Sequence, residues 1–164
     1  MPQDYYDQPL EYRRQQLGAE SIHQLCKSLV LENTKVRNAD PESPHSVRYF
    51  CVVIQYAAKL HAEKVRTFLH QQAAGAVGRK QFNMRLAAED EVQQLTGYGH
   101  NAVTPIGMAT PLPVLLSHRI ANLQPDFFWM GGGEVDLKVG MRVSEFVAKY
   151  RPIVMDCTHD ETEA

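Results

Sequence analysis

The sequence predicts a mixed α/β fold, in which a curved mixed β-sheet or barrel-like core is flanked by helices. Many short apolar segments of strand length are interleaved with three or four segments of helical periodicity. This interleaving favours a curved mixed sheet or partly closed barrel over a doubly wound parallel sheet. The 164 residues, of which 44% are hydrophobic, match one domain spanning 1–164, with flexible tails expected at 1–11 and 159–164.

The first elements to be expected are a short helix and a hairpin of two strands. Ile22, Leu25 and Cys26 share one face at helical spacing, which indicates a helix before residue 27. Segment 28–32 has the pattern of a strand, and segment 49–56 is apolar on both faces, as in a deeply buried strand. The intervening loop, 38–46, carries two prolines and several turn formers, so we expect an exposed hairpin loop there.

The later elements follow from apolar periodicity and from the residues that end helices. A helix is predicted over 59–72, where apolar residues recur at near-helical intervals. A second helix is predicted from residue 89, because segment 89–95 begins with acidic residues and Gly97 follows as a helix end. A last helix is predicted over 143–150. Further strands are predicted at 82–86, 113–116, 127–130, 135–139 and 153–155.

Composition limits the location and the partners of the protein. Its three cysteines show no paired spacing, which argues against disulfides and zinc and favours a reducing compartment. No apolar run approaches the ~20 residues of a membrane span and the N-terminus lacks signal-peptide features, so we expect a cytoplasmic protein without membrane contact, metal or cofactor. The net charge of −2 gives no general attraction to nucleic acid, so any RNA contact must be local.

Lys27 is the first candidate site residue, because it stands between an apolar helix end and an apolar strand. Burial of an ammonium group is costly. Lys27 therefore either extends to water or meets an anionic or carbonyl partner in a pocket, and both interpretations remain open at this point.

The second candidate is the glycine-rich stretch 96–107. Such a loop brings backbone N–H groups close to a ligand, and amides aimed at one point suit a carbonyl oxygen that gains negative charge during hydrolysis. The alternative is a tight connecting loop. His100 within it is either a hydrogen-bonded loop residue or a general base.

The third candidate is the glycine triplet at 131–133, which follows an aromatic-rich strand. Consecutive glycines allow a flat nucleotide or a phosphate to lie against the backbone, although a simple hairpin turn explains them equally well. The chain lacks the ending of a P-loop, a dinucleotide fingerprint, a Gly-x-Ser-x-Gly elbow and a His-Glu-x-x-His motif.

Taken in order, these segments resemble the YbaK family, the prolyl-tRNA-synthetase-associated editing domains, over residues 12–158. The resemblance rests on Cys26-Lys27-Ser28-Leu29-Val30, on Thr96-Gly97-Tyr98 leading to Thr104-Pro105-Ile106-Gly107, and on the glycine triplet. It implies a mixed barrel-like sheet flanked by helices. It also implies hydrolysis of the ester that links a wrong amino acid, such as alanine or cysteine, to the terminal adenosine of a tRNA, often the tRNA for proline.

The resemblance implies roles for individual residues as well. Lys27 matches the family lysine that faces the substrate near its ester and terminal nucleotide, and Ser28 matches a neighbouring small hydroxyl position. The family loop of form Gly-x-x-x-Pro falls on 101–105, and its amides are thought to hold the substrate carbonyl. The expected catalytic residues are thus Lys27, Asn101 and Ala102. The expected substrate contacts are Ser28, Gly97, His100, Val103, Thr104, Pro105, Gly107, Gly131, Gly132 and Gly133.

Two positions depart from the family pattern. Asn101 stands where the family usually has Gly; Asn enters left-handed backbone conformations at modest cost, so the loop shape is expected to persist while the side chain narrows or repolarises the pocket. Glu134 stands in a stretch that the family often fills with basic residues. That change predicts weaker binding of the terminal phosphates, or binding assisted by another protein.

The resulting hypothesis is an aminoacyl-tRNA deacylase that edits in trans, with the acceptor end of aminoacyl-tRNA and a prolyl-tRNA synthetase as partners. Water is the expected nucleophile, oriented by the free ribose hydroxyl of the substrate in preference to His100. The main alternative is a non-catalytic module that binds an acceptor end or a synthetase, and a further one is a small-molecule hydrolase or carrier. The sequence leaves the oligomeric state open.

Overall fold

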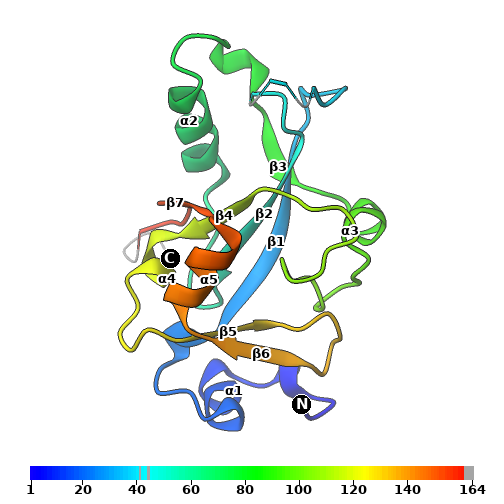
Figure 1. The fold of residues 1–164 in the computed structure, drawn as a ribbon. Coiled ribbons are helices and arrows are strands. Elements are labelled where there is room, and N and C mark those ends of the chain that lie inside the picture. The colour runs from blue at the N-terminus through cyan, green and yellow to red at the C-terminus, as the bar shows by residue number, and fades with distance from the viewer. Residues whose placement is uncertain (41, 44, 161–164) are drawn as a thin grey trace.

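A five-stranded mixed sheet forms the centre of the structure, a computed structural model that describes residues 1–40, 42–43 and 45–160 (Figure 1). The strand order is β3-β1-β2-β4-β7. β1 pairs antiparallel with β2 and β3, whereas β4 pairs in parallel with β2 and β7. The strands are β1 (Cys26–Asn33), β2 (Tyr49–Gln55), β3 (Met84–Leu86), β4 (Val114–Ser117) and β7 (Ile153–Met155).

A second, two-stranded antiparallel sheet consists of β5 (Phe128–Gly131) and β6 (Lys138–Met141). A parallel bridge between Leu25 and Trp129 joins it to the chain just before β1. The helices are α1 (Leu10–Leu17), α2 (Ala62–Gln72), α3 (Glu89–Thr96), α4 (His118–Ala121) and α5 (Val143–Tyr150). Short 3₁₀ turns lie at η1 (Tyr5–Asp7), η2 (Ile22–Gln24) and η3 (Arg79–Gln81).

The core lies on both faces of the five-stranded sheet. Cys51 and Val53 of β2 point into one apolar cluster, together with Phe128 of β5 and Phe146 of α5. The alternate residues of β2 point into a second cluster that α2 covers. Because β2 is buried on both faces, every position from 50 to 54 is apolar, which is the pattern that predicted a deeply buried strand.

The predicted mixed α/β fold is confirmed, and most predicted elements are present. Strand 153–155 and helix 143–150 have the predicted bounds, while β6 begins three residues later than predicted. The helix predicted before residue 27 is present only as the 3₁₀ turn η2, Ile22–Gln24. Ser21 and Gln24 form a capping box around η2, and Cys26 already belongs to β1. The helical spacing of Ile22, Leu25 and Cys26 arose because Ile22 lies in a short turn and Cys26 begins a strand.

The N-terminal segment 1–11, expected to be a flexible tail, packs against the β5–β6 hairpin. Tyr5 is 1% exposed, and the terminal ammonium donates a hydrogen bond to Asp136 O at 2.8 Å. Figure 1 shows this segment and α1 lying beside β6. At the other end, His159 stacks on His61 with ring centroids 4.2 Å apart, whereas 161–164 and positions 41 and 44 of the predicted hairpin loop lie outside the described residues.

Within the described part of the chain, no helix is long and apolar enough to cross a membrane.

Three strands are tied together by a buried carboxylate at the far end of β1. Glu32 is 1% exposed and pairs with Arg48 at 3.2 Å and with Arg85 at 2.9 Å. Burial raises the pKa of Glu32, but hydrogen bonds from Tyr49, Arg48 and Arg85 outweigh burial and hold the pKa below its usual value. The two arginines are partly exposed, so they can regain water when Glu32 is replaced.

We expect Glu32→Gln to lower the free energy of unfolding at pH 7 by about 1–3 kcal/mol, the usual loss for a hydrogen bond to a charged group. A carboxylate with a depressed pKa stabilises the fold above its unfolded pKa. The difference between wild type and variant should therefore shrink as the pH falls below about 4. Urea unfolding between pH 3 and pH 7 measures this difference in unfolding free energy, and Glu20→Gln, at an exposed position, is the control. A difference that does not change with pH would contradict the ionic role.

Candidate active site

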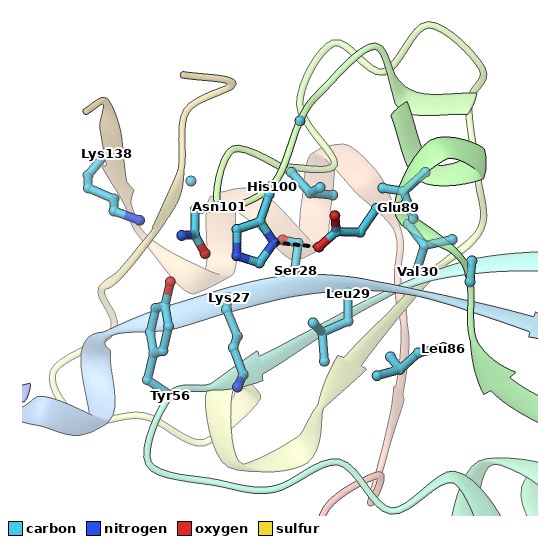
Figure 2. A pocket seen from close by; sticks show the side chains of 15 residues that line it. Lys27, Ser28, Leu29, Val30, Tyr56, Leu86, Glu89, His100, Asn101 and Lys138 are labelled. Carbon is cyan, nitrogen blue, oxygen red and sulfur yellow. Dashed lines mark ion pairs between the residues drawn. The ribbon is translucent and has the colours of Figure 1, made fainter. Parts of the chain in front are cut away.

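A cavity of about 370 Å³ opens between the first half of β1, the β3–α3 connection, the glycine-rich loop and the β5–β6 hairpin (Figure 2). Its walls come from segments more than 100 residues apart in sequence, which only the fold brings together. It is lined by Lys27, Ser28, Leu29, Val30, Tyr56, Leu86, Ala87, Glu89, Val92, Gly99, His100, Asn101, Val103, Gly131 and Lys138.

Lys27 lies on β1, paired in register with Ile54, and its half-buried side chain forms one wall of this cavity. Its ammonium group lies 5.4 Å from the centroid of the Tyr56 ring, within the range of a cation–π contact. Burial, followed by the charge of Arg13, lowers the pKa of Lys27. Of the two interpretations left open by the sequence, the structure favours a lysine that faces a pocket. Ser28, the next residue, is 9% exposed and lines the same cavity.

The glycine-rich loop lines the cavity with residues 99–101 and 103. Asn101 has φ = 62°, so it takes the left-handed conformation expected for this position. Within the described residues, the N–H groups of Asn101 and Val103 donate to no acceptor, and both residues line the cavity. Tyr98 closes the base of the loop by donating its hydroxyl to Ile106 O. Two amides are therefore free to bind an oxygen atom.

Ala102 was expected to contribute an amide to the site, and the structure gives it a different role. Its N–H donates to Gly99 O at 3.1 Å, and the residue is 4% exposed. Because this amide already closes a turn, it is not free for a substrate. Val103, expected only as a substrate contact, has the free amide instead.

Four further loop residues expected at the substrate do not line the cavity, and each has a structural role. Gly97, with φ = 80°, ends α3, and Gly107 has φ = 66°. Thr104 is 1% exposed and its hydroxyl accepts a hydrogen bond from the N–H of Ile106 at 3.4 Å. Pro105 is buried. These residues shape the loop and do not present groups to its open side.

His100 lies at the rim of the cavity. Its Nδ1 is 3.1 Å from a carboxylate oxygen of Glu89, and the two side chains are 72% and 82% exposed. Figure 2 shows this pair above Ser28. A histidine so open to solvent and engaged with a carboxylate on one side is poorly placed to hold a buried water.

The glycine triplet contacts the protein's own chain, as the hairpin-turn interpretation of the sequence requires. Added Cβ atoms would meet Val103 O at 2.9 Å from Gly131, Leu137 at 2.7 Å from Gly132 and the Tyr98 ring at 2.8 Å from Gly133. Of the three, only Gly131 lines the cavity. These glycines allow the hairpin to pack closely against the loop.

Sequence reasoning missed one end of the cavity, where aromatic and basic side chains meet. Lys138 of β6 donates a hydrogen bond to the hydroxyl of Tyr6, which in turn donates to Asn101 O at 2.9 Å. Tyr56 and Lys138 both line the cavity beside Asn101, as Figure 2 shows. Burial, then the charge of Arg13, lowers the pKa of Lys138 to about 8. The adjacent tyrosines at the N-terminus were the only sequence signal for this feature.

No group of three or more His, Cys, Asp or Glu side chains among the described residues is placed to hold a metal ion. The polar side chains that line the cavity are those of Lys27, Ser28, Tyr56, Glu89, His100, Asn101 and Lys138.

Comparison with solved structures supports the fold. A proposed trans-editing enzyme for prolyl-tRNA synthetase superposes with a TM-score of 0.72 at 22% identity, covering 98% of this chain and 84% of that one. A scaffold protein used for epitope grafting gives 0.69 at 19% identity, with 93% and 82% covered. A crystallised hypothetical protein gives 0.69 at 19% identity, with 92% and 83% covered.

A search of curated proteins gives no match. The model of the aminoacyl-tRNA editing domain matches residues 13–148, which is most of the chain. The chain therefore belongs to the aminoacyl-tRNA editing domain family.

Proposed function

We propose that the protein is an aminoacyl-tRNA deacylase that hydrolyses the ester of a mischarged tRNA, acting in trans on tRNA for proline that carries a small wrong amino acid. The observation that carries the proposal is the convergence of Lys27 and the free amides of Asn101 and Val103 on one cavity. Family membership supports the substrate class. The solved structure described as a proposed trans-editing enzyme for prolyl-tRNA synthetase supports the choice of tRNA.

In this mechanism the ester carbonyl accepts hydrogen bonds from the N–H groups of Asn101 and Val103. As water attacks, the carbonyl oxygen gains negative charge, and fixed amides stabilise that charge without reorganising. The left-handed conformation of Asn101 and the turn closed by Ala102 hold the two amides in place before the substrate arrives.

Lys27 binds the terminal nucleotide beside the ester and adds positive charge to the site. Its lowered pKa reflects an ammonium group that is partly stripped of water and has no carboxylate partner within the described residues. Such a group gains more from an oxygen-rich substrate than a fully hydrated lysine does.

The nucleophilic water needs a group to orient it. His100 is paired with Glu89 at the exposed rim, so the free hydroxyl of the terminal ribose is the better candidate. Among the residues that line the cavity, Glu89 is the one carboxylate, and it lies at that same rim. The substrate then supplies the group that the protein lacks.

The side chain of Asn101 points into the cavity between Lys138 and His100, and it restricts the room for the amino acid (Figure 2). This arrangement favours a small side chain such as that of alanine. It is also the observation that favours the alternative function, a module that binds an acceptor end or a synthetase without cleavage, because the same side chain obstructs the approach to the amides.

We expect Lys27→Ala to lower kcat/KM for deacylation by about 10²–10³-fold, comparable to the loss of one oxyanion-stabilising group. Alanyl-, seryl- and cysteinyl-tRNA for proline are the substrates, and Lys149→Ala, at an exposed position outside the cavity, is the matched control. Circular dichroism checks that the variants are folded. A wild type inactive on all three substrates would favour the binding module.

Two substitutions at Asn101 separate backbone shape from side-chain bulk. Asn101→Gly keeps the left-handed conformation and should raise activity on cysteinyl relative to alanyl substrate by about tenfold, because room for one extra group is worth ~1–3 kcal/mol. Asn101→Val, a β-branched residue disfavoured at φ = 62°, should abolish activity. Relative kcat/KM values measure both effects. A valine variant as active as wild type would exclude the amide mechanism.

A further inference from the structure

A cluster of three cations and three tyrosine rings lies at one end of the cavity, and the mechanism above uses only Lys27 from it. Arg13 lies 5.2 Å from the Tyr56 ring centroid, and Lys138 lies 4.6 Å from the Tyr6 centroid and 5.9 Å from the Tyr56 centroid. The cationic cluster, as we call it, consists of Tyr5, Tyr6, Arg13, Lys27, Tyr56 and Lys138.

The charge of the cationic cluster is uncompensated. None of its three cations pairs with a carboxylate within the described residues. The tyrosines cannot supply negative charge, because burial raises the pKa of Tyr5 to about 12 and raises those of Tyr6 and Tyr56 as well. At neutral pH they remain hydroxyl donors beside like charges.

Arg13 and Lys138 differ in what their charge does for the fold. The guanidinium of Arg13 donates to Gln8 O at 2.9 Å and to Tyr6 O at 2.8 Å, so it fixes the N-terminal segment. Among the described residues, Lys138 has the Tyr6 hydroxyl as its one acceptor, and it lines the cavity. Burial and the charge of Arg13 lower its pKa, so its charge is unfavourable without an anionic partner. An ammonium group that is partly buried at a cavity wall without a carboxylate partner is a candidate binding site for an anionic ligand.

We propose that Lys138, with the hydroxyl of Tyr56, binds a backbone phosphate of the RNA, namely the phosphodiester on the 5′ side of the terminal nucleoside whose ester faces Lys27. This inference rests on the proposed function. Lys27 and Lys138 both lie within 6 Å of the Tyr56 ring centroid, so the ester site and the phosphate site adjoin. Tyr6, which accepts the hydrogen bond from Lys138, lies outside the family match at 13–148.

The test measures binding of the dinucleotide cytidylyl-3′,5′-adenosine and of adenosine, which lacks the phosphate. Lys138→Met should weaken dinucleotide binding by about 10- to 100-fold and leave adenosine binding unchanged, as expected for a hydrogen bond to a charged group. The slope of log K against log salt should fall in magnitude by about 0.7, the value for one phosphate contact on a single strand. Lys149→Met is the matched control and should change neither ligand.

Thermal unfolding distinguishes a binding role from a structural one. Lys138→Met without ligand should melt at or above the wild-type temperature, because it removes an uncompensated charge. A lower melting temperature together with unchanged dinucleotide affinity would overturn the proposal, as would equal losses for the dinucleotide and adenosine. Inorganic phosphate that binds as tightly as the dinucleotide would identify a free-anion site and would also overturn it.

A measurement on the wild type does not depend on the folding of any variant. The dinucleotide, but not adenosine, should raise the pKa of Lys138 from about 8, as followed by NMR of the lysine side chain. An unchanged pKa would count against the phosphate contact.

A deacylation assay separates the failure of this proposal from the failure of the proposed function. If the wild type binds the dinucleotide through Lys138 but cleaves no ester, the phosphate site stands and the deacylase function is overturned. If Lys138→Met deacylates as fast as the wild type, the deacylase function stands and the phosphate site is overturned.

Discussion

The close approach of Gly131 to the carbonyl of Val103 is the contact on which the candidate site depends. A Cβ atom at residue 131 would lie 2.9 Å from Val103 O, so only glycine lets the β5–β6 hairpin reach this loop. The hairpin fixes one side of the loop, and the Tyr98 hydroxyl on Ile106 O fixes its base. Once the loop is held in this way, residues 101 and 103 line the same cavity as Lys27. The geometry of the candidate site therefore follows from backbone packing more than from any side chain in the loop.

The same hairpin connects the loop to the N-terminus. Lys138 of β6 donates to the Tyr6 hydroxyl, and that hydroxyl donates to Asn101 O. The carbonyl of Asn101 is thus restrained from outside the family match, and the N–H of the same peptide unit, that of Ala102, donates to Gly99 O. Because both polar groups of this peptide unit are bonded, the unit fixes the loop between residues 101 and 103. The N-terminal segment is therefore part of the structure that shapes the candidate site.

The parts of the fold that could be predicted are those fixed by local periodicity. The strand at 153–155 and the helix at 143–150 have the predicted bounds, and the alternation of buried faces explains β2. Lys27 and the loop were found because their residue types are unusual for their surroundings. The contacts of Tyr6 span 95 residues to Asn101 and 132 to Lys138, and no local pattern encodes them. The role of Ala102 was missed for another reason, since composition identifies a glycine-rich loop but not which of its amides is already bonded.

On the proposed function, the distribution of charge explains how a protein with a net charge of −2 selects one end of an RNA. Non-specific RNA binding needs many phosphate contacts on an open basic surface, and the acidic balance of this chain opposes it. The cations of the cluster are instead gathered at a cavity, among tyrosine rings that keep water away. In the proposed complex, a phosphate reaches them when the terminal nucleoside lies beside Lys27. Affinity then depends on the simultaneous fit of ester, nucleoside and phosphate, so an internal stretch of RNA, which has no terminal nucleoside to insert, gains little from the same charges.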